Sequence, residues 1–64
     1  MRLSLLELRR REHERYLRRR HGWWWSLSIE RGDAVLRCGD ADLLTVRFPA
    51  RELFDPTALS KRGF

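Results

Sequence analysis

Two kinds of side chain that can bind nucleic acid lie next to each other in the first half of the chain. Seven arginines occur between Arg9 and Arg20, and the tryptophans Trp23, Trp24 and Trp25 follow after one histidine and one glycine. A guanidinium binds phosphate through two parallel hydrogen bonds and keeps its charge at physiological pH. An indole ring offers a flat surface for a nucleic-acid base. This spacing suggests a phosphate-binding surface beside an aromatic platform.

The net charge of the chain lies entirely in its N-terminal third. Residues 1–21 contain eight arginines and three glutamates, a balance of +5, whereas residues 22–64 contain six basic and six acidic residues, a balance of zero. The arginines outnumber the glutamates with which they can pair along a helix, and this excess indicates an anionic partner. Two alternatives are a charged helix face that is simply solvated, and a preference for arginine that reflects the base composition of the genome.

The residues that carry this charge are expected to form one long helix. Residues 2–21 contain no glycine or proline and are rich in leucine, arginine and glutamate, all of which favour a helix. Gly22 is a typical helix stop. With about 3.6 residues per turn, one apolar side carries Leu3, Leu6, His13 and Leu17. The opposite side carries an arginine ridge, which consists of Arg11, Arg15, Arg18 and Arg19.

Residues 23–48 alternate between apolar and polar types, which predicts a three-stranded antiparallel meander. A two-residue turn at Arg31-Gly32 and a loop at Asp40–Asp42 would join the strands. This register keeps apolar residues opposite one another. The predicted pairs are Ile29–Ala34, Leu27–Leu36, Trp25–Cys38, Cys38–Leu44 and Leu36–Val46.

The tryptophans divide between the two faces of the first predicted strand. Trp23 and Trp25 head the apolar face and are expected in the core, where they would supply large buried surfaces. Trp24 falls on the polar face, which it shares with Arg37 and Arg47 from the other strands. Such a face can stack a base and hold phosphates, or it can anchor a protein partner. The alternative is that the C-terminal segment covers Trp24.

The chain after the meander predicts one or two short helical turns over residues 49–64. Pro49 ends the last strand, Asp55 is placed as an N-cap before Pro56, and Gly63 can end the turn. We therefore expect a single α+β domain over residues 1–64, in which a long amphipathic helix packs on a three-stranded antiparallel meander.

No set of side chains in the sequence predicts catalysis, a metal or a cofactor. Cys38 is the only cysteine, so no disulfide can form within the chain, and it is expected to lie inert in the core. His13 and His21 lack the spacing of a zinc site, and we expect His13 to be a satisfied histidine on the apolar side of the helix. The tripeptide Arg31–Asp33 is explained by the turn. We expect a binding protein rather than an enzyme.

The sequence contains no apolar run of the roughly 18 residues that cross a bilayer. Its start turns to dense charge, rather than to the long apolar stretch of a signal peptide. We expect a cytoplasmic protein without membrane contact, and a complete small gene product.

The leading hypothesis is a small basic module that binds DNA or RNA through the arginine ridge, largely irrespective of base sequence. Trp24, Arg37 and Arg47 would form a second contact surface. The alternative is a regulator or inhibitor of the phage or mobile-element type, which docks on a larger host protein or nucleoprotein complex through the ridge and Trp24. A further alternative is a homo-oligomer in which apolar helix residues pair between subunits, namely Leu5, Leu8 and Tyr16.

Overall fold

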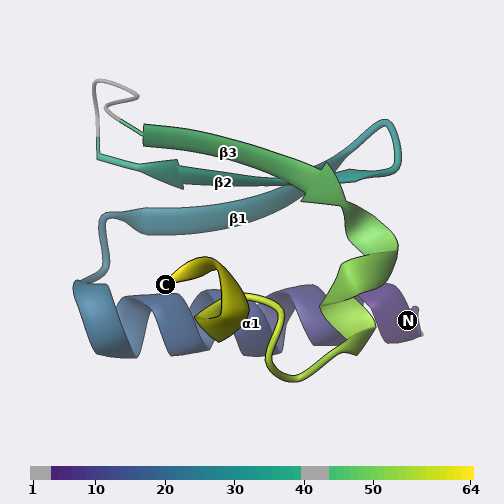
Figure 1. The fold of residues 1–64 in the computed structure, drawn as a ribbon, viewed down its shortest axis with the longest axis horizontal. Coiled ribbons are helices and arrows are strands. Elements are labelled where there is room, and N and C mark those ends of the chain that lie inside the picture. Colours follow the sequence, from purple (N-terminus) through teal and green to yellow (C-terminus); the bar gives the residue numbers. More distant parts are fainter. Residues whose placement is uncertain (1–3, 40–43) are drawn as a thin grey trace.

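One long helix lies across one face of a three-stranded sheet in the computed structural model, which describes residues 4–39 and 44–64 (Figure 1). The elements in chain order are α1 (Leu5–His21), β1 (Trp25–Glu30), β2 (Asp33–Cys38), β3 (Leu44–Pro49) and the short 3-10 helices η1 (Ala50–Phe54) and η2 (Ser60–Arg62). The strands are antiparallel and stand in the order β1-β2-β3. The predicted α+β architecture is confirmed.

Helix α1 begins and ends with local hydrogen bonds that its sequence encodes. The side chain of Ser4 accepts a hydrogen bond of 3.1 Å from the backbone N–H of Glu7, as an N-cap does. At the other end, the N–H of Gly22 donates to Arg18 at 3.0 Å, and its φ of 124° suits a glycine. The predicted helix start at residue 2 and the predicted apolar residue Leu3 lie outside the described residues.

The predicted strand register is confirmed at every apolar pair named from the sequence. Glu30 lies opposite Asp33, so the turn between β1 and β2 contains only Arg31 and Gly32. Their φ angles are 53° and 80°, which is the geometry of a type I′ turn. The loop predicted at Asp40–Asp42 lies outside the described residues.

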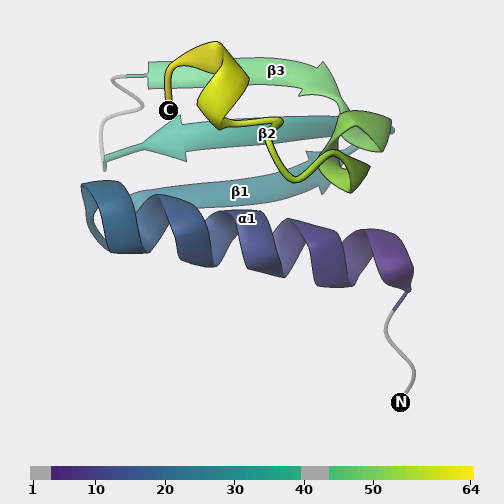
Figure 2. The same ribbon diagram turned by 60° about the horizontal axis from the view of Figure 1, so that its bottom comes forward.

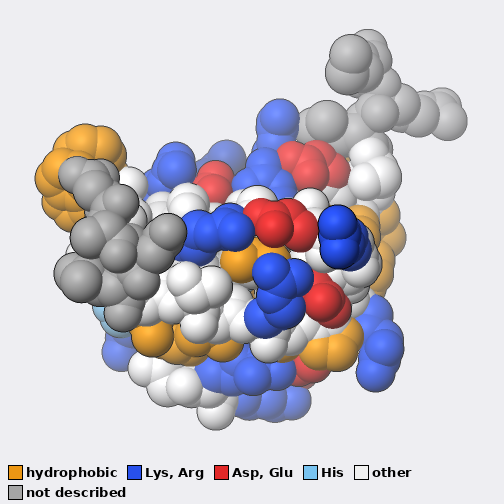
Figure 3. Space-filling view, turned by 90° about the horizontal axis from the view of Figure 1, so that it is seen from above, with side chains coloured by type: hydrophobic (Ala, Val, Ile, Leu, Met, Phe, Trp, Pro, Cys, Tyr) orange, Lys and Arg blue, Asp and Glu red, His pale blue; other side chains and the backbone are white. Residues whose placement is uncertain are grey.

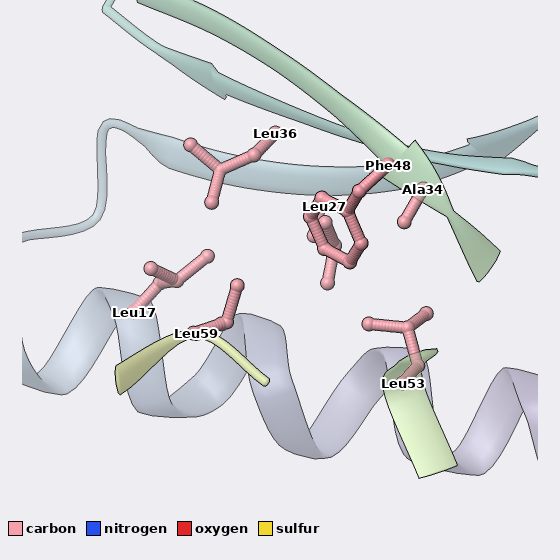
Figure 4. Packing of buried hydrophobic residues seen from close by; sticks show 7 residues of the cluster. All are labelled: Leu17, Leu27, Ala34, Leu36, Phe48, Leu53 and Leu59. Atoms are coloured by element: carbon pink, nitrogen blue, oxygen red, sulfur yellow. The ribbon is translucent and has the colours of Figure 1, made fainter. Parts of the chain in front are cut away.

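The core lies between the sheet and a second layer, which α1 and the C-terminal segment form together. Figures 1 and 2 show that both pack on the same face of the sheet, with α1 running along β1. Seven buried side chains from α1, from the three strands and from the C-terminal segment, residues 50–64, meet there (Figure 4). They are Leu17, Leu27, Ala34, Leu36, Phe48, Leu53 and Leu59. The C-terminal segment is therefore part of the core, rather than a tail.

The prediction that His13 is a histidine with a satisfied hydrogen bond on the apolar side of the helix is confirmed. His13 is buried, and its Nε2 lies 2.8 Å from the carbonyl oxygen of Leu53 in η1. This contact ties the middle of α1 to the C-terminal segment. Cys38 was expected in the core, but it is only half-buried because it ends β2 at the margin of the sheet.

The prediction that Trp23 lies in the core is wrong. Strand β1 begins only at Trp25, and the two preceding tryptophans belong to the turn that follows Gly22. The alternation of a strand therefore does not extend to Trp23, which is 68% exposed. Trp25 is half-buried, with its ring stacked on His21 at 4.5 Å and edge-on to Phe64 at 5.7 Å.

The C-terminal segment ends at Gly63 as predicted, but its second helical turn does not start after Asp55: residues 56–59 form a turn, and η2 begins at Ser60 with Leu59 as its N-cap. Asp55 accepts hydrogen bonds from the backbone N–H and the hydroxyl of Thr57, at 2.9 and 2.8 Å, and binds Lys61 at 2.6 Å. The ammonium of Lys61, followed by the bonds from Thr57, holds the pKa of Asp55 well below its usual range. Gly63 ends the segment in the left-handed conformation. Trp24 is 51% exposed, so the alternative that this segment covers it is wrong.

Candidate nucleic-acid interface

Three side chains of α1 bind the free backbone edge of β1. Arg10 donates to the carbonyl of Leu27 at 2.7 Å, and Glu14 accepts from the N–H of Leu27 at 2.9 Å. Arg18 donates through Nε to the carbonyl of Trp25 at 3.0 Å. Their spacing of four residues places them on one line along the helix. They satisfy the backbone groups that an edge strand would otherwise expose.

The glutamates of α1 hold the same arginines in place. Arg10 pairs with Glu7 at 2.6 Å and with Glu14 at 3.4 Å, and Arg11 pairs with Glu7 at 3.6 Å. Arg18 reaches Glu14 at 3.8 Å. The hydrogen bond from Arg10 lowers the pKa of Glu7, and the same bond raises the pKa of Arg10. Glu7 is therefore charged at neutral pH.

A surface hollow of about 400 Å³ lies along this side of α1. Its lining residues are Arg10, Arg11, Glu14, Arg15 and Arg18, and we call it the arginine hollow. Four cationic side chains and one carboxylate thus surround one space. Among the residues that the structure describes, Arg15 has no ion pair, and its charge is uncompensated. The hollow has the chemistry of an anion site.

The structure brings most of the predicted arginine ridge together. Arg11, Arg15 and Arg18 are exposed and line the same hollow. Arg19 is exposed as well, but it lies beside Arg15 on the neighbouring surface, with Glu12 and Tyr16. Sequence reasoning missed Arg10 as a lining residue. The four-residue repeat of Arg10, Glu14 and Arg18 was the available signal.

The second predicted surface is electrically balanced. Arg37 binds Glu30 at 2.8 Å, and Arg47 lies 4.0 Å from Glu30 and 3.7 Å from Asp33. The hydrogen bond from Arg37 lowers the pKa of Glu30. Figure 3 shows this open face of the sheet, with basic and acidic side chains interspersed over a small apolar patch. Val35 lies fully buried on this face, covered by the neighbouring side chains.

Trp24 does not join Arg37 and Arg47 in one site. The guanidinium of Arg37 reaches along the sheet to Ser28 and Glu30, toward the end of β1, whereas Trp24 precedes its start. Trp24 instead stacks on Trp23, with ring centroids 3.9 Å apart and planes inclined by 27°. The two indoles are 51% and 68% exposed. We call them the tryptophan pair, of which sequence reasoning had identified only Trp24 as a surface residue.

Within residues 4–39 and 44–64, no group of three or more His, Cys, Asp or Glu side chains could hold a metal ion. No helix in the same part of the chain is long and apolar enough to span a membrane. Comparison with protein families, with curated proteins and with solved structures finds no match to this chain.

Proposed function

We propose that this protein is a non-enzymatic, cytoplasmic module that binds the phosphate backbone of a nucleic acid in the arginine hollow. The observation that carries the proposal is the gathering of Arg10, Arg11, Arg15 and Arg18 around one space, with Arg15 uncompensated. Guanidinium groups bind phosphate oxygens in a bidentate geometry and are weakly hydrated, so they lose little on contact.

The hollow is held open and charged by its own fold. Glu14 accepts a hydrogen bond from the N–H of Leu27 and pairs with Arg10 and Arg18, rather than with Arg15. From Arg11 to Arg18 the helix rises about 10 Å, a length that spans several phosphates of a nucleic-acid strand. Such binding displaces counterions and weakens steeply as salt is raised, with little dependence on base sequence.

The test compares two double variants with the same net charge. Arg11→Ala/Arg15→Ala removes two lining cations that, among the described residues, donate no hydrogen bond to β1. Arg31→Asn/Arg51→Ala removes two exposed arginines outside α1 that have no ion pair among the described residues. Arg10 and Arg18 are kept because they bind the backbone of β1.

Binding of labelled DNA and RNA is measured by fluorescence anisotropy across a salt series. We expect a log–log slope of about −2 to −4 for the wild type, and a slope shallower by about 2 for Arg11→Ala/Arg15→Ala. The control variant should bind within about threefold of the wild type. Equal losses in both variants, or no binding by the wild type near physiological salt, would contradict the proposal.

A second candidate is docking on an acidic protein surface or on a second copy of the chain. Leu5 and Leu8 favour it, because they are 56% and 42% exposed on α1 and a phosphate backbone offers them no apolar contact. Sedimentation of the purified protein at high micromolar concentration tests the second copy. Retention of one partner protein from a nuclease-treated lysate, lost on Leu5→Ser/Leu8→Ser substitution, would favour the acidic protein.

A further inference from the structure

We infer that the preferred ligand is a single-stranded nucleic acid, whose unpaired bases stack on the tryptophan pair while its phosphates lie in the arginine hollow. This inference rests on the proposed function and adds the class of nucleic acid. It joins two features of the surface, the stacked indoles of Trp23 and Trp24 and the cations of α1.

The tryptophan pair has no part in the core. The cluster of buried residues and the apolar residues packed against it include Trp25 but neither Trp23 nor Trp24. Each of the two indoles leaves more than half of its surface in water. Exposed aromatic rings of this size are unfavourable in water, and they are a common feature of surfaces that bind a planar ligand. Figure 3 shows hydrophobic side chains projecting from the end of the molecule where β1 begins.

The position of the pair is fixed by backbone contacts on both sides. The carbonyl of Trp24 accepts a hydrogen bond of 3.2 Å from the N–H of Gly39, just after β2. The N–H of Trp25 donates to the carbonyl of Gly22 at 3.3 Å. The two rings also stack on each other. The pair is therefore a preorganised aromatic surface, and little side-chain freedom remains to be lost when a base stacks on it.

The pair and the hollow adjoin. Arg18 lines the hollow, and its Nε donates to the carbonyl of Trp25, the residue directly after the pair. Arg19 and Arg20 stand in the last turn of α1, both exposed and without an ion pair among the described residues. One continuous strand can thus place phosphates beside arginines and neighbouring bases against indoles.

The arginine hollow and the tryptophan pair together favour one class of ligand over the others. An acidic protein would satisfy the arginines but supplies no planar groups at regular intervals beside its charges. A duplex satisfies the arginines as well, yet its bases already stack within the helix and cannot reach the indoles. A single strand offers phosphates and free bases in alternation, and aromatic side chains with a basic groove are the usual means of binding it.

The test measures the affinity of the purified full chain for an oligothymidylate of about 12 nucleotides and for a hairpin duplex of the same length. The variant is Trp23→Ala/Trp24→Ala. Its matched control is Leu5→Ala/Phe54→Ala, which also removes two exposed apolar side chains. Circular dichroism and the emission of Trp25 report that the variants remain folded.

We expect the wild type to prefer the single strand, and Trp23→Ala/Trp24→Ala to bind it about 5- to 100-fold more weakly, as loss of base stacking predicts. Duplex affinity should change less than threefold, and the control should match the wild type with both ligands. Quenching of tryptophan emission on binding of the oligothymidylate is a second expected result.

The outcomes separate this inference from the proposed function. Equal, salt-dependent affinity for both ligands that the tryptophan substitutions leave unchanged would overturn the inference and leave phosphate binding in the hollow intact. Absence of binding to either ligand would overturn both. An equal loss of single-strand affinity in Trp23→Ala/Trp24→Ala and in Leu5→Ala/Phe54→Ala would also overturn the inference. The binding would then depend on exposed apolar surface in general and not on the tryptophan pair.

Discussion

Two arginines of α1, one turn and a half apart, have different surroundings. Arg10 is mostly buried, pairs with Glu7 and Glu14, and donates to the backbone of β1. Arg15 lines the same hollow but is exposed and has no ion pair within the described part of the chain. The sequence around them is a single run of arginine and glutamate, so residue type alone does not separate the two roles.

The difference shows how one run of like residues can serve both stability and binding. A cation whose hydrogen bonds are complete stabilises the fold and has few donors left for a ligand. A cation without a partner adds little to stability and is available to an anion. Arg18 lies between these limits, because it binds Trp25 and Glu14 but remains half exposed. The following substitutions test this division.

The largest effect is expected for Arg10→Met, which keeps the aliphatic stem but removes the guanidinium. The carbonyl of Leu27 then loses its partner, and Glu7 and Glu14 lose an ion pair. We expect the free energy of unfolding to fall by about 2 kcal/mol, against less than about 0.5 kcal/mol for Arg15→Met. Urea unfolding followed by tryptophan emission measures both. Equal urea midpoints for Arg10→Met and Arg15→Met would contradict the division between stabilising and ligand-binding arginines.

Glu14→Gln should move stability and binding in opposite directions. The amide oxygen can still accept from Leu27, but the charge that faces Arg10 and Arg18 is lost. We expect a loss of about 1 kcal/mol in stability and about 3- to 10-fold tighter binding of nucleic acid at low salt. Glu12→Gln is the matched control, because within the described part of the chain Glu12 pairs only with Arg9 and does not line the hollow. A larger gain in the control would contradict this role of Glu14.

Arg31 is neither an arginine that stabilises the fold nor one that lines the arginine hollow, so we expect it to be replaceable. Its φ of 53° is unfavourable for a residue with a long side chain, and Asn-Gly is the preferred pair in a type I′ turn. We expect Arg31→Asn to stabilise the protein by about 0.5 kcal/mol and to leave nucleic-acid binding unchanged. Thermal unfolding and the salt series check both parts. A loss of affinity would assign this arginine to the interface.

The smallest expected effect is on the pH dependence of the stability of the protein. Because Arg10 lowers the pKa of Glu7 in the folded protein below its usual 4.5, the unfolded chain binds more protons between the two values. The stabilisation is therefore complete above about pH 4.5 and is lost as the pH falls through the folded pKa. Urea midpoints between pH 5 and pH 3 should fall less for Glu7→Gln than for the wild type. A steeper fall in the variant would show that this pair is not involved.

Much of the fold could be predicted because its signals are local. The meander register follows from alternation and from a two-residue turn at Arg31-Gly32, since a slip by one residue would expose every apolar side chain of a strand. The end of α1 follows from Gly22. Its N-cap, Ser4, stands three residues before Glu7, a spacing that marks the start of a helix.

The site was predictable only in part, because exposure and pairing depend on contacts between distant residues. The arginine ridge follows from helical periodicity, and three of its members do line one hollow. Trp23 was misplaced because alternation was extended into residues that form a turn. The neutral surface around Arg37 and Arg47 could have been suspected from Glu30 and Asp33, which the register places opposite each other and which pair with these two arginines.

The order of elements, the strand register and the excess of positive charge in residues 1–21 all follow from the sequence, because each depends only on residues that are near one another in the chain. The tertiary structure, in contrast, sets which arginines bind β1 and which have no partner among the described residues, since that depends on where the edge of the sheet lies relative to each turn of the helix. It also placed the C-terminal segment over the core and left Trp23 and Trp24 outside it, because packing against distant elements decides burial.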